Sequence, residues 1–317
     1  MSTPSETINF CGLLSETNRI RRTNSLLFFA LSGLFLFPLS LSTLIYPTLQ
    51  SSLSQYDAVN TQILHHNPTE TLILYLLYTL FVTLLSLCAT STITYTAFHG
   101  FYGTPVKFKS AIKSLVYSVP PLVITMVVSQ IIVALIGMIF GILVALLYTG
   151  SQFFGFEIDY NSNYFIGLCI FLAILLGLIV IWLQVNWALA SVIVVVESKW
   201  GIEPLRRSTH LMKGMKGLWL SILLLYGFPI GFFSWANSTP VVISNGFCDW
   251  GLWLFILKIL STSFLVNLFM LQILVANTVL YMYCKAFHGE LALQSGDEFA
   301  PEYTSVPIDD DKVAHGV

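Results

Sequence analysis

The sequence predicts an all-α polytopic membrane protein: a bundle of six transmembrane helices with interfacial elbow helices on the cytoplasmic side. Apolar residues make up 56% of the chain, charged residues only 9%, and the mean hydropathy is +0.80. A soluble domain has about 25% charged residues and could not bury this much apolar surface. The net charge of -2 indicates little about partners, because the charges lie in short segments between apolar runs.

Six apolar segments reach or exceed the roughly 20 residues that cross a bilayer core. They cover 26–48, 71–98, 115–148, 164–196, 218–236 and 251–284. The third, fourth and sixth are longer than one crossing requires, so we expect these helices to tilt, kink or continue past the headgroups. The first segment is longer than the core of a cleavable signal peptide, so we expect it to remain as the first span.

The basic residues predict the orientation of the chain. They gather before the first span and in the second and fourth loops: Arg19, Arg21, Arg22, Lys107, Lys109, Lys113, Lys199, Arg206, Arg207, Lys213 and Lys216. The other loops, 49–70, 149–163 and 237–250, contain neither Lys nor Arg. Because cytoplasmic loops carry the excess of positive charge, we predict that both termini are cytoplasmic.

Three regions follow from these patterns. Residues 1–24 form a cytoplasmic interfacial segment with mixed apolar and polar residues at near-helical spacing, and residues 25–285 form the transmembrane domain. Residues 286–317 are acidic and rich in Gly, Pro and Ser, which predicts a disordered tail. Tyr303-Thr304-Ser305-Val306 fits a motif that cytosolic sorting proteins bind, and the alternative is an ordinary solvated tail.

The segment after the fourth span predicts an amphipathic elbow helix at the interface. Pro204 suits a first helical turn. Spacings of three and four relate Ile202, Leu205, Thr209, Met212 and Met215. Four cations would contact anionic headgroups or partner proteins, or would only set the topology: Arg206, Arg207, Lys213 and Lys216. We expect Glu197, at the end of the span, to pair with Lys199 or with an elbow arginine.

Several polar residues lie within the predicted spans. They are Gln130, Gln184, Asn186, Lys258, Asn267 and Gln272. Lys258 is near the outer end of its span, so its stem can extend toward the headgroups. The neutral residues either form hydrogen bonds between helices or line a solute cavity among helices three, four and six. On a helical wheel Asn267 lies nearly opposite Gln272, which argues against a continuous polar pore.

Two resemblances add to this interpretation. The first is carried by the runs Gly12-Leu13-Leu14-Ser15-Glu16, 29–39 and Trp187-Ala188-Leu189-Ala190-Ser191 through Glu197, with Gly201, Ser208 and Lys213-Gly214 of the elbow. These residues resemble a family of uncharacterised plant multi-pass membrane proteins, which is similar to this chain over nearly its whole length. The elbow is also loosely similar to the membrane domain attached to some bacterial glycerophosphodiester phosphodiesterases. The catalytic barrel of those enzymes has no counterpart here. The resemblance implies a six-helix endomembrane or plasma-membrane protein and no activity.

No catalytic, nucleotide-binding or zinc motif occurs in the chain, so we expect no enzyme activity, no cofactor and no metal site. The basic residues follow the membrane surface, which argues against nucleic acid as a partner. The leading hypothesis is a non-enzymatic membrane protein that organises lipids or partner proteins at the cytoplasmic face. The alternative is a transporter or channel for a neutral or amphiphilic small solute.

Two modifications stay open at this point. Cys11 and Cys284 are predicted near the cytoplasmic face, where cysteines next to a membrane can be acylated. The alternative is that they serve as small buried apolar residues. Asn237 begins an acceptor pattern for glycosylation, Asn237-Ser238-Thr239, directly before Pro240.

Overall fold

The computed structural model describes residues 10–46, 68–104, 106–153, 163–238 and 249–289, and these residues form helices and no strand. Six helical stretches among them are long and apolar enough to cross a membrane. They are Ser25–Tyr46, Leu72–Phe101, Phe108–Gly150, Phe165–Glu197, Lys216–Asn237 and Trp253–Phe287. The predicted all-α fold with six spans is confirmed. Residues 290–317, which make up most of the predicted acidic tail, lie outside the described residues.

The helices follow the chain in this order. α1 (Phe10–Thr23) precedes the first span, which consists of α2 (Ser25–Leu31), the π-helix η1 (Ser32–Leu36) and helical residues 37–46. The second and third spans are α4 (Pro68–Phe101) and α5 (Phe108–Phe153). The fourth consists of α6 (Asn163–Trp187) and α7 (Ala190–Glu197), and the elbow helix is α8 (Glu203–Leu211). The fifth consists of α9 (Lys216–Ile222), the π-helix η2 (Leu223–Gly227) and α10 (Phe228–Ser238), and the sixth is α11 (Asp249–Phe287).

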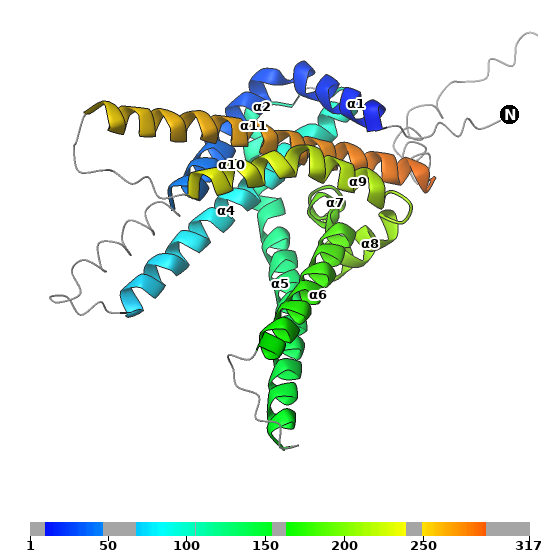
Figure 1. Ribbon diagram of the computed structural model, residues 1–317. Coiled ribbons are helices and arrows are strands. Elements are labelled where there is room, and N and C mark those ends of the chain that lie inside the picture. The colour runs from blue at the N-terminus through cyan, green and yellow to red at the C-terminus, as the bar shows by residue number, and fades with distance from the viewer. Residues whose placement is uncertain (1–9, 47–67, 105, 154–162, 239–248, 290–317) are drawn as a thin grey trace, which may run out of the picture.

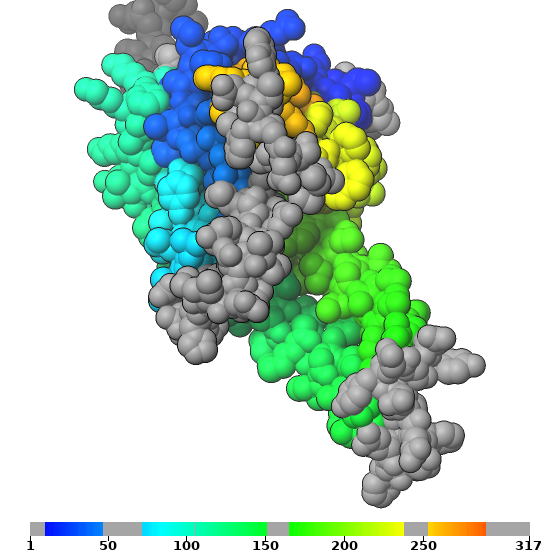
Figure 2. Space-filling view, turned by 60° about the vertical axis from the view of Figure 1, so that its left-hand side comes forward, coloured from blue at the N-terminus to red at the C-terminus, as the bar shows by residue number. Residues whose placement is uncertain are grey.

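The spans diverge from one end of the molecule (Figure 1). At that end α1, α7 and α8 pack with α4 and α11. We call it the basic end, because it carries the Lys and Arg residues of α1, of the α4–α5 connection and of the elbow. Away from it, α10 and α11 run in one direction (Figure 1), whereas the α5–α6 pair projects in another (Figures 1 and 2). Helices that diverge in this way must be tilted if they cross one bilayer, which agrees with their excess length.

The buried core lies at the basic end. It includes residues of α1, α4, α7, α8 and α11, among them Leu13, Ile20, Ile93, Ala97, Ile193, Leu211, Val279, Leu280 and Tyr281. Toward the other end the long helices expose large apolar side chains, such as Ile139 of α5 and Phe171 of α6, which are 64% and 62% exposed. A surface of this kind requires a bilayer around it, because water would not solvate it favourably.

α1 is part of this core. Leu13, Thr17 and Ile20 are spaced four and three residues apart, so they lie on one helical face, and all three are buried. Gly100 of α4 lets α1 approach closely, since a Cβ atom there would lie 3.0 Å from Cγ2 of Ile20 and 3.3 Å from Nδ2 of Asn24. The segment predicted to lie on the membrane surface therefore packs against the spans along one side.

Both π-helices end two residues before a proline, at Pro38 and at Pro229. Proline has no backbone N–H, and its ring clashes with the carbonyl group four residues earlier in an α-helix. The wider turn of a π-helix relieves this clash without interrupting the span. η1 and η2 both contact α11, so the two widened turns lie beside the same helix.

Candidate functional site

Two glycines with positive φ flank α8 and form the turns that lead into it and out of it. Gly201 (φ 75°) precedes α8 and Gly214 (φ 89°) follows it, in a conformation that L side chains rarely adopt. Pro204 lies in the first turn of α8, as its sequence position predicts. Leu205 and Met212 of the predicted apolar face are buried, whereas Ile202 is 65% exposed, because it precedes the first turn and does not face the core.

A serine connects α8 to the break between α6 and α7. The Ser208 hydroxyl donates to the Asn186 carbonyl at 2.7 Å and accepts from the Leu189 N–H at 3.2 Å. Ser208 is fully buried. The break between α6 and α7 would otherwise leave the Asn186 carbonyl and the Leu189 N–H without hydrogen-bond partners. Because Ser208 bonds both groups, its side chain holds the elbow helix against the fourth span.

Glu197 lies at the centre of a polar network between α7, α8 and α11. Its Oε1 accepts hydrogen bonds from Arg207 Nε and from the Tyr281 hydroxyl, each at 2.8 Å. Lys199 Nζ lies 3.8 Å from Oε2 of the same carboxylate. The expected pairing of Glu197 with Lys199 and an elbow arginine is confirmed. Tyr281 was missed by the sequence analysis, because a tyrosine 84 residues away gives no local signal.

The four elbow cations have different surroundings. Arg207 is held by Glu197, and its Nε lies 2.6 Å from Glu197 Oε2. Lys216 lies over the Trp182 ring, with Nζ 5.4 Å from the ring centroid, as in a cation–π contact. Arg206 and Lys213 are exposed. Among the four, Arg206 and Lys213 therefore offer the most accessible positive charge.

The carboxylates of the basic end are engaged in internal ion pairs. Glu16 pairs with Arg19, Glu197 pairs with Arg207, and Glu203 pairs with Lys199 at 2.6 Å. These are the carboxylates of this end whose side chains the structure describes. The hydrogen bond and charge of Glu16 raise the pKa of Arg19, which stays positively charged.

The exposed cations of this end are Arg19, Arg22, Lys107, Lys109, Lys113, Arg206 and Lys213. The basic end thus presents a positive surface.

Two of the predicted intramembrane polar residues line one cavity of about 340 Å³. The cavity lies between α4, α5, α6, α7, α8 and α9, and Gln130 and Gln184 contribute to its wall. Its other polar and aromatic lining residues include Ser129, Ser191, Trp187 and Trp219. Asn186 is close in sequence but buried, and its Nδ2 donates to the Trp182 carbonyl of its own helix at 2.7 Å. The cavity combines hydrogen-bonding groups with apolar walls.

The polar residues of α11 do not line this cavity. Asn267 is buried, and its Oδ1 has no hydrogen-bond partner among the described residues. The same holds for the buried Oε1 of Gln272 within that part of the chain. Lys258 is exposed. The cavity that Gln130 and Gln184 line thus receives no residue from α11, which runs in a different direction from the α5–α6 pair (Figure 1). The contribution of helix six to a joint cavity stays a prediction.

In the part of the chain that the structure describes, no group of three or more His, Cys, Asp or Glu residues is arranged to hold a metal ion. His99 and His288 serve local contacts instead. Nδ1 of His99 is 3.2 Å from the Thr104 hydroxyl, and Nδ1 of His288 is 2.8 Å from the Cys284 carbonyl.

Comparison with known proteins places the chain in a family. A family model described as a domain of unknown function, DUF8558, matches residues 5–295, which is most of the chain. The chain therefore belongs to this family. No curated protein and no solved structure shows a significant match to it.

Proposed function

We propose that this member of the DUF8558 family is a non-enzymatic integral membrane protein that organises anionic lipids at its basic end, and that this end faces the cytoplasm. One observation carries the proposal. Each described carboxylate of the basic end is used in an internal ion pair, whereas the cations Arg206, Lys213, Lys107, Lys109 and Lys113 stay exposed.

The positions of these cations support a role at the lipid headgroups. They lie in or near the ends of spans whose apolar side chains face outward, where the headgroups of a surrounding bilayer would begin. Each Lys or Arg near an anionic surface contributes about 1 kcal/mol of attraction. Several such residues together would enrich anionic lipids around the protein, and an acidic partner protein would be attracted by the same surface.

The proposal is tested by measuring which lipids surround the reconstituted protein. The full chain is placed in vesicles that contain labelled phosphatidylserine or labelled phosphatidylcholine, and the preference between them is measured. Replacing Arg206 and Lys213 with Gln should lower the preference for phosphatidylserine by about fivefold for each charge removed. Lys258→Gln is the matched control, because it removes an exposed cation of α11 outside the elbow. Equal preference in all variants would contradict the proposal.

The resemblance to plant multi-pass proteins extends the proposal to an endomembrane or plasma-membrane location. In this proposal the elbow serves as a lipid-contacting element. Binding of a cytosolic sorting protein to Tyr303-Thr304-Ser305-Val306 stays a prediction, because this motif lies outside the described residues.

A second candidate function is transport of a neutral or amphiphilic solute. The observation in its favour is the cavity of about 340 Å³ that Gln130 and Gln184 line together. Amide groups beside Trp187 and Trp219 suit a ligand with one hydrogen-bonding group and an apolar body. We place this function second, because the polar residues of α11 do not contribute to the cavity.

A further inference from the structure

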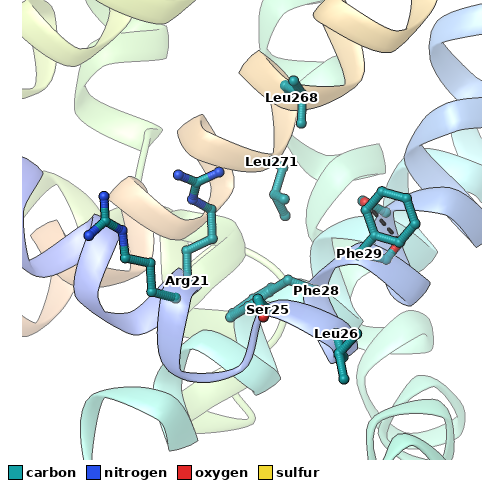
Figure 3. Close-up of a pocket in the computed structure, with 9 residues that line it drawn as sticks. Arg21, Ser25, Leu26, Phe28, Phe29, Leu268 and Leu271 are labelled. Atoms are coloured by element: carbon teal, nitrogen blue, oxygen red, sulfur yellow. Dashed lines mark hydrogen bonds between the residues drawn. The ribbon is translucent and has the colours of Figure 1, made fainter.

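A second cavity, of about 370 Å³, lies between the start of the first span and the middle of α11. Arg21 and Arg22, in the last turn of α1, form one part of its wall. The remainder is largely apolar, with Phe28 and Phe29 of α2 and Leu268 and Leu271 of α11. Figure 3 shows Arg21 on one side and the two leucines of α11 on the other.

The two arginines form no ion pair with the carboxylates that the structure describes. The nearest acidic residue in sequence, Glu16, is already engaged by Arg19 through two hydrogen bonds. Arg21 has one long contact, from its Nη2 to Oδ1 of Asn18 at 3.4 Å. Its Nε is buried and has no hydrogen-bond partner within the described residues. Two adjacent positive charges at one cavity, without a described counter-charge, favour an anionic ligand.

The apolar part of the cavity wall indicates that the ligand also has an apolar portion. Leu26 and Phe29 are 86% and 66% exposed, at the beginning of a span whose outer surface must meet lipid. The cavity therefore connects a cationic end with the apolar surface of the protein. A molecule that satisfies both has an anionic head and a hydrocarbon chain. Guanidinium groups bind phosphate oxygens in a bidentate manner, which favours a phosphate over a single-point anion.

We propose that this cavity binds one glycerophospholipid of the adjacent leaflet, with its phosphate at Arg21 and Arg22 and an acyl chain along Phe29, Leu268 and Leu271. This inference rests on the proposed function, organisation of anionic lipids at the basic end, and it assigns one of those lipids to a defined site. It differs from the elbow surface, because the elbow attracts many lipids through charge alone, whereas this cavity holds one molecule.

The test uses the purified full chain in detergent and native mass spectrometry with added phosphatidic acid. The wild-type protein should bind one phosphatidic acid molecule. Replacing Arg21 and Arg22 with Gln should weaken this binding by at least about tenfold, since two charge-assisted contacts are lost. Lys258→Gln removes an exposed cation of α11 that does not line this cavity, and it should leave this binding unchanged.

Leu26→Glu provides a variant that does not depend on removing the arginines. Leu26 is exposed at the rim of the cavity, so the substitution disturbs little packing and adds a carboxylate that competes with the phosphate. It should also weaken phosphatidic acid binding by about tenfold or more. Unchanged binding in both Leu26→Glu and the double arginine variant would overturn the proposal. Displacement of the lipid by oleate or inorganic phosphate at equal concentration would overturn it as well, since the cavity would then select any anion.

The two proposals fail in distinguishable ways. If the arginine variant loses the single lipid while the elbow variant keeps its phosphatidylserine preference, the cavity is supported and the elbow function is contradicted. The reverse result contradicts the cavity and leaves the elbow function supported.

Discussion

Arg207 Nε lies 2.6 Å from Oε2 of Glu197, which joins the elbow helix α8 to the end of the fourth span. The two side chains are only 26% and 13% exposed. Glu197→Gln removes the counter-charge of Arg207 and keeps the side-chain shape. We expect a loss of about 1–3 kcal/mol in stability, below the 3–5 kcal/mol of a fully buried pair.

Thermal unfolding of the purified protein in detergent checks this expectation. Glu203→Gln is the matched control, because Glu203 also pairs with a cation, Lys199, but its side chain is 61% exposed. An exposed pair contributes about 0–1 kcal/mol, so the control should unfold close to wild type. If both variants unfold alike, the Glu197 network does not stabilise the fold as described.

Ser208→Ala should destabilise the junction between α6, α7 and α8. The variant leaves the Asn186 carbonyl and the Leu189 N–H without the partner they share, at a fully buried position. We expect a loss of about 1–3 kcal/mol. Ser221→Ala removes an exposed hydroxyl that, among the described residues, bonds only the Gly217 carbonyl of its own helix. This variant should cost less than about 0.5 kcal/mol. Hydrogen exchange of α7 and α8 amides should rise in Ser208→Ala alone.

Gly100→Ala should weaken the docking of α1 on α4. The added methyl group would lie 3.0 Å from Cγ2 of Ile20, so this side chain must move by a few tenths of an ångström. We expect this overpacking to cost about 1–3 kcal/mol. Gly12→Ala is the control within α1 itself, because nothing lies within 4 Å of its added Cβ. That control should be neutral or stabilising by up to about 1 kcal/mol through helix propensity. Limited proteolysis before the first span reports the docking, and equal cleavage of both variants would contradict the close contact.

Cys11 and Cys284 should differ sharply in reactivity. Cys11 is exposed, whereas Cys284 is fully buried, so only Cys11 offers a thiol for acylation. In a variant with the other three cysteines replaced, a polar maleimide should label Cys11 at once and Cys284 only after unfolding. In cells, labelling of Cys11 should require permeabilisation if the basic end faces the cytoplasm. Labelling of intact cells would contradict this orientation, and Cys11→Ser controls for residual reaction.

The transport hypothesis makes a separate prediction. Gln130→Leu with Gln184→Leu removes the amide groups from the cavity and keeps its apolar walls. Flux of a neutral amphiphile into proteoliposomes should fall at least about tenfold if these amides bind it. Asn267→Leu is the control, since Asn267 does not line the cavity. Flux that is equal in all three proteins would leave no role for this cavity in transport.

The sequence by itself determined the helical class and the number of spans. The predicted first and fifth segments, 26–48 and 218–236, agree with Ser25–Tyr46 and Lys216–Asn237, because the hydrocarbon core imposes a minimum length of apolar residues that is readable locally. The pairing of Glu197 was also predictable, since Lys199 lies in the connection that follows it and Arg207 lies in the next helix, α8.

Only the tertiary structure decided how the spans are arranged and which polar residues meet. Gln130 and Gln184 share a cavity while Asn267 does not, and Tyr281 reaches Glu197 from another span. The tetrapeptide Ala-Phe-His-Gly occurs twice in the chain, at 97–100 and at 286–289, and illustrates the same limit. Gly100 of the first copy is buried against α1, whereas Gly289 of the second is exposed with a φ of 74°. Hydropathy determines where a chain meets lipid, but contacts between spans depend on side-chain packing among residues far apart in sequence, which no local pattern encodes.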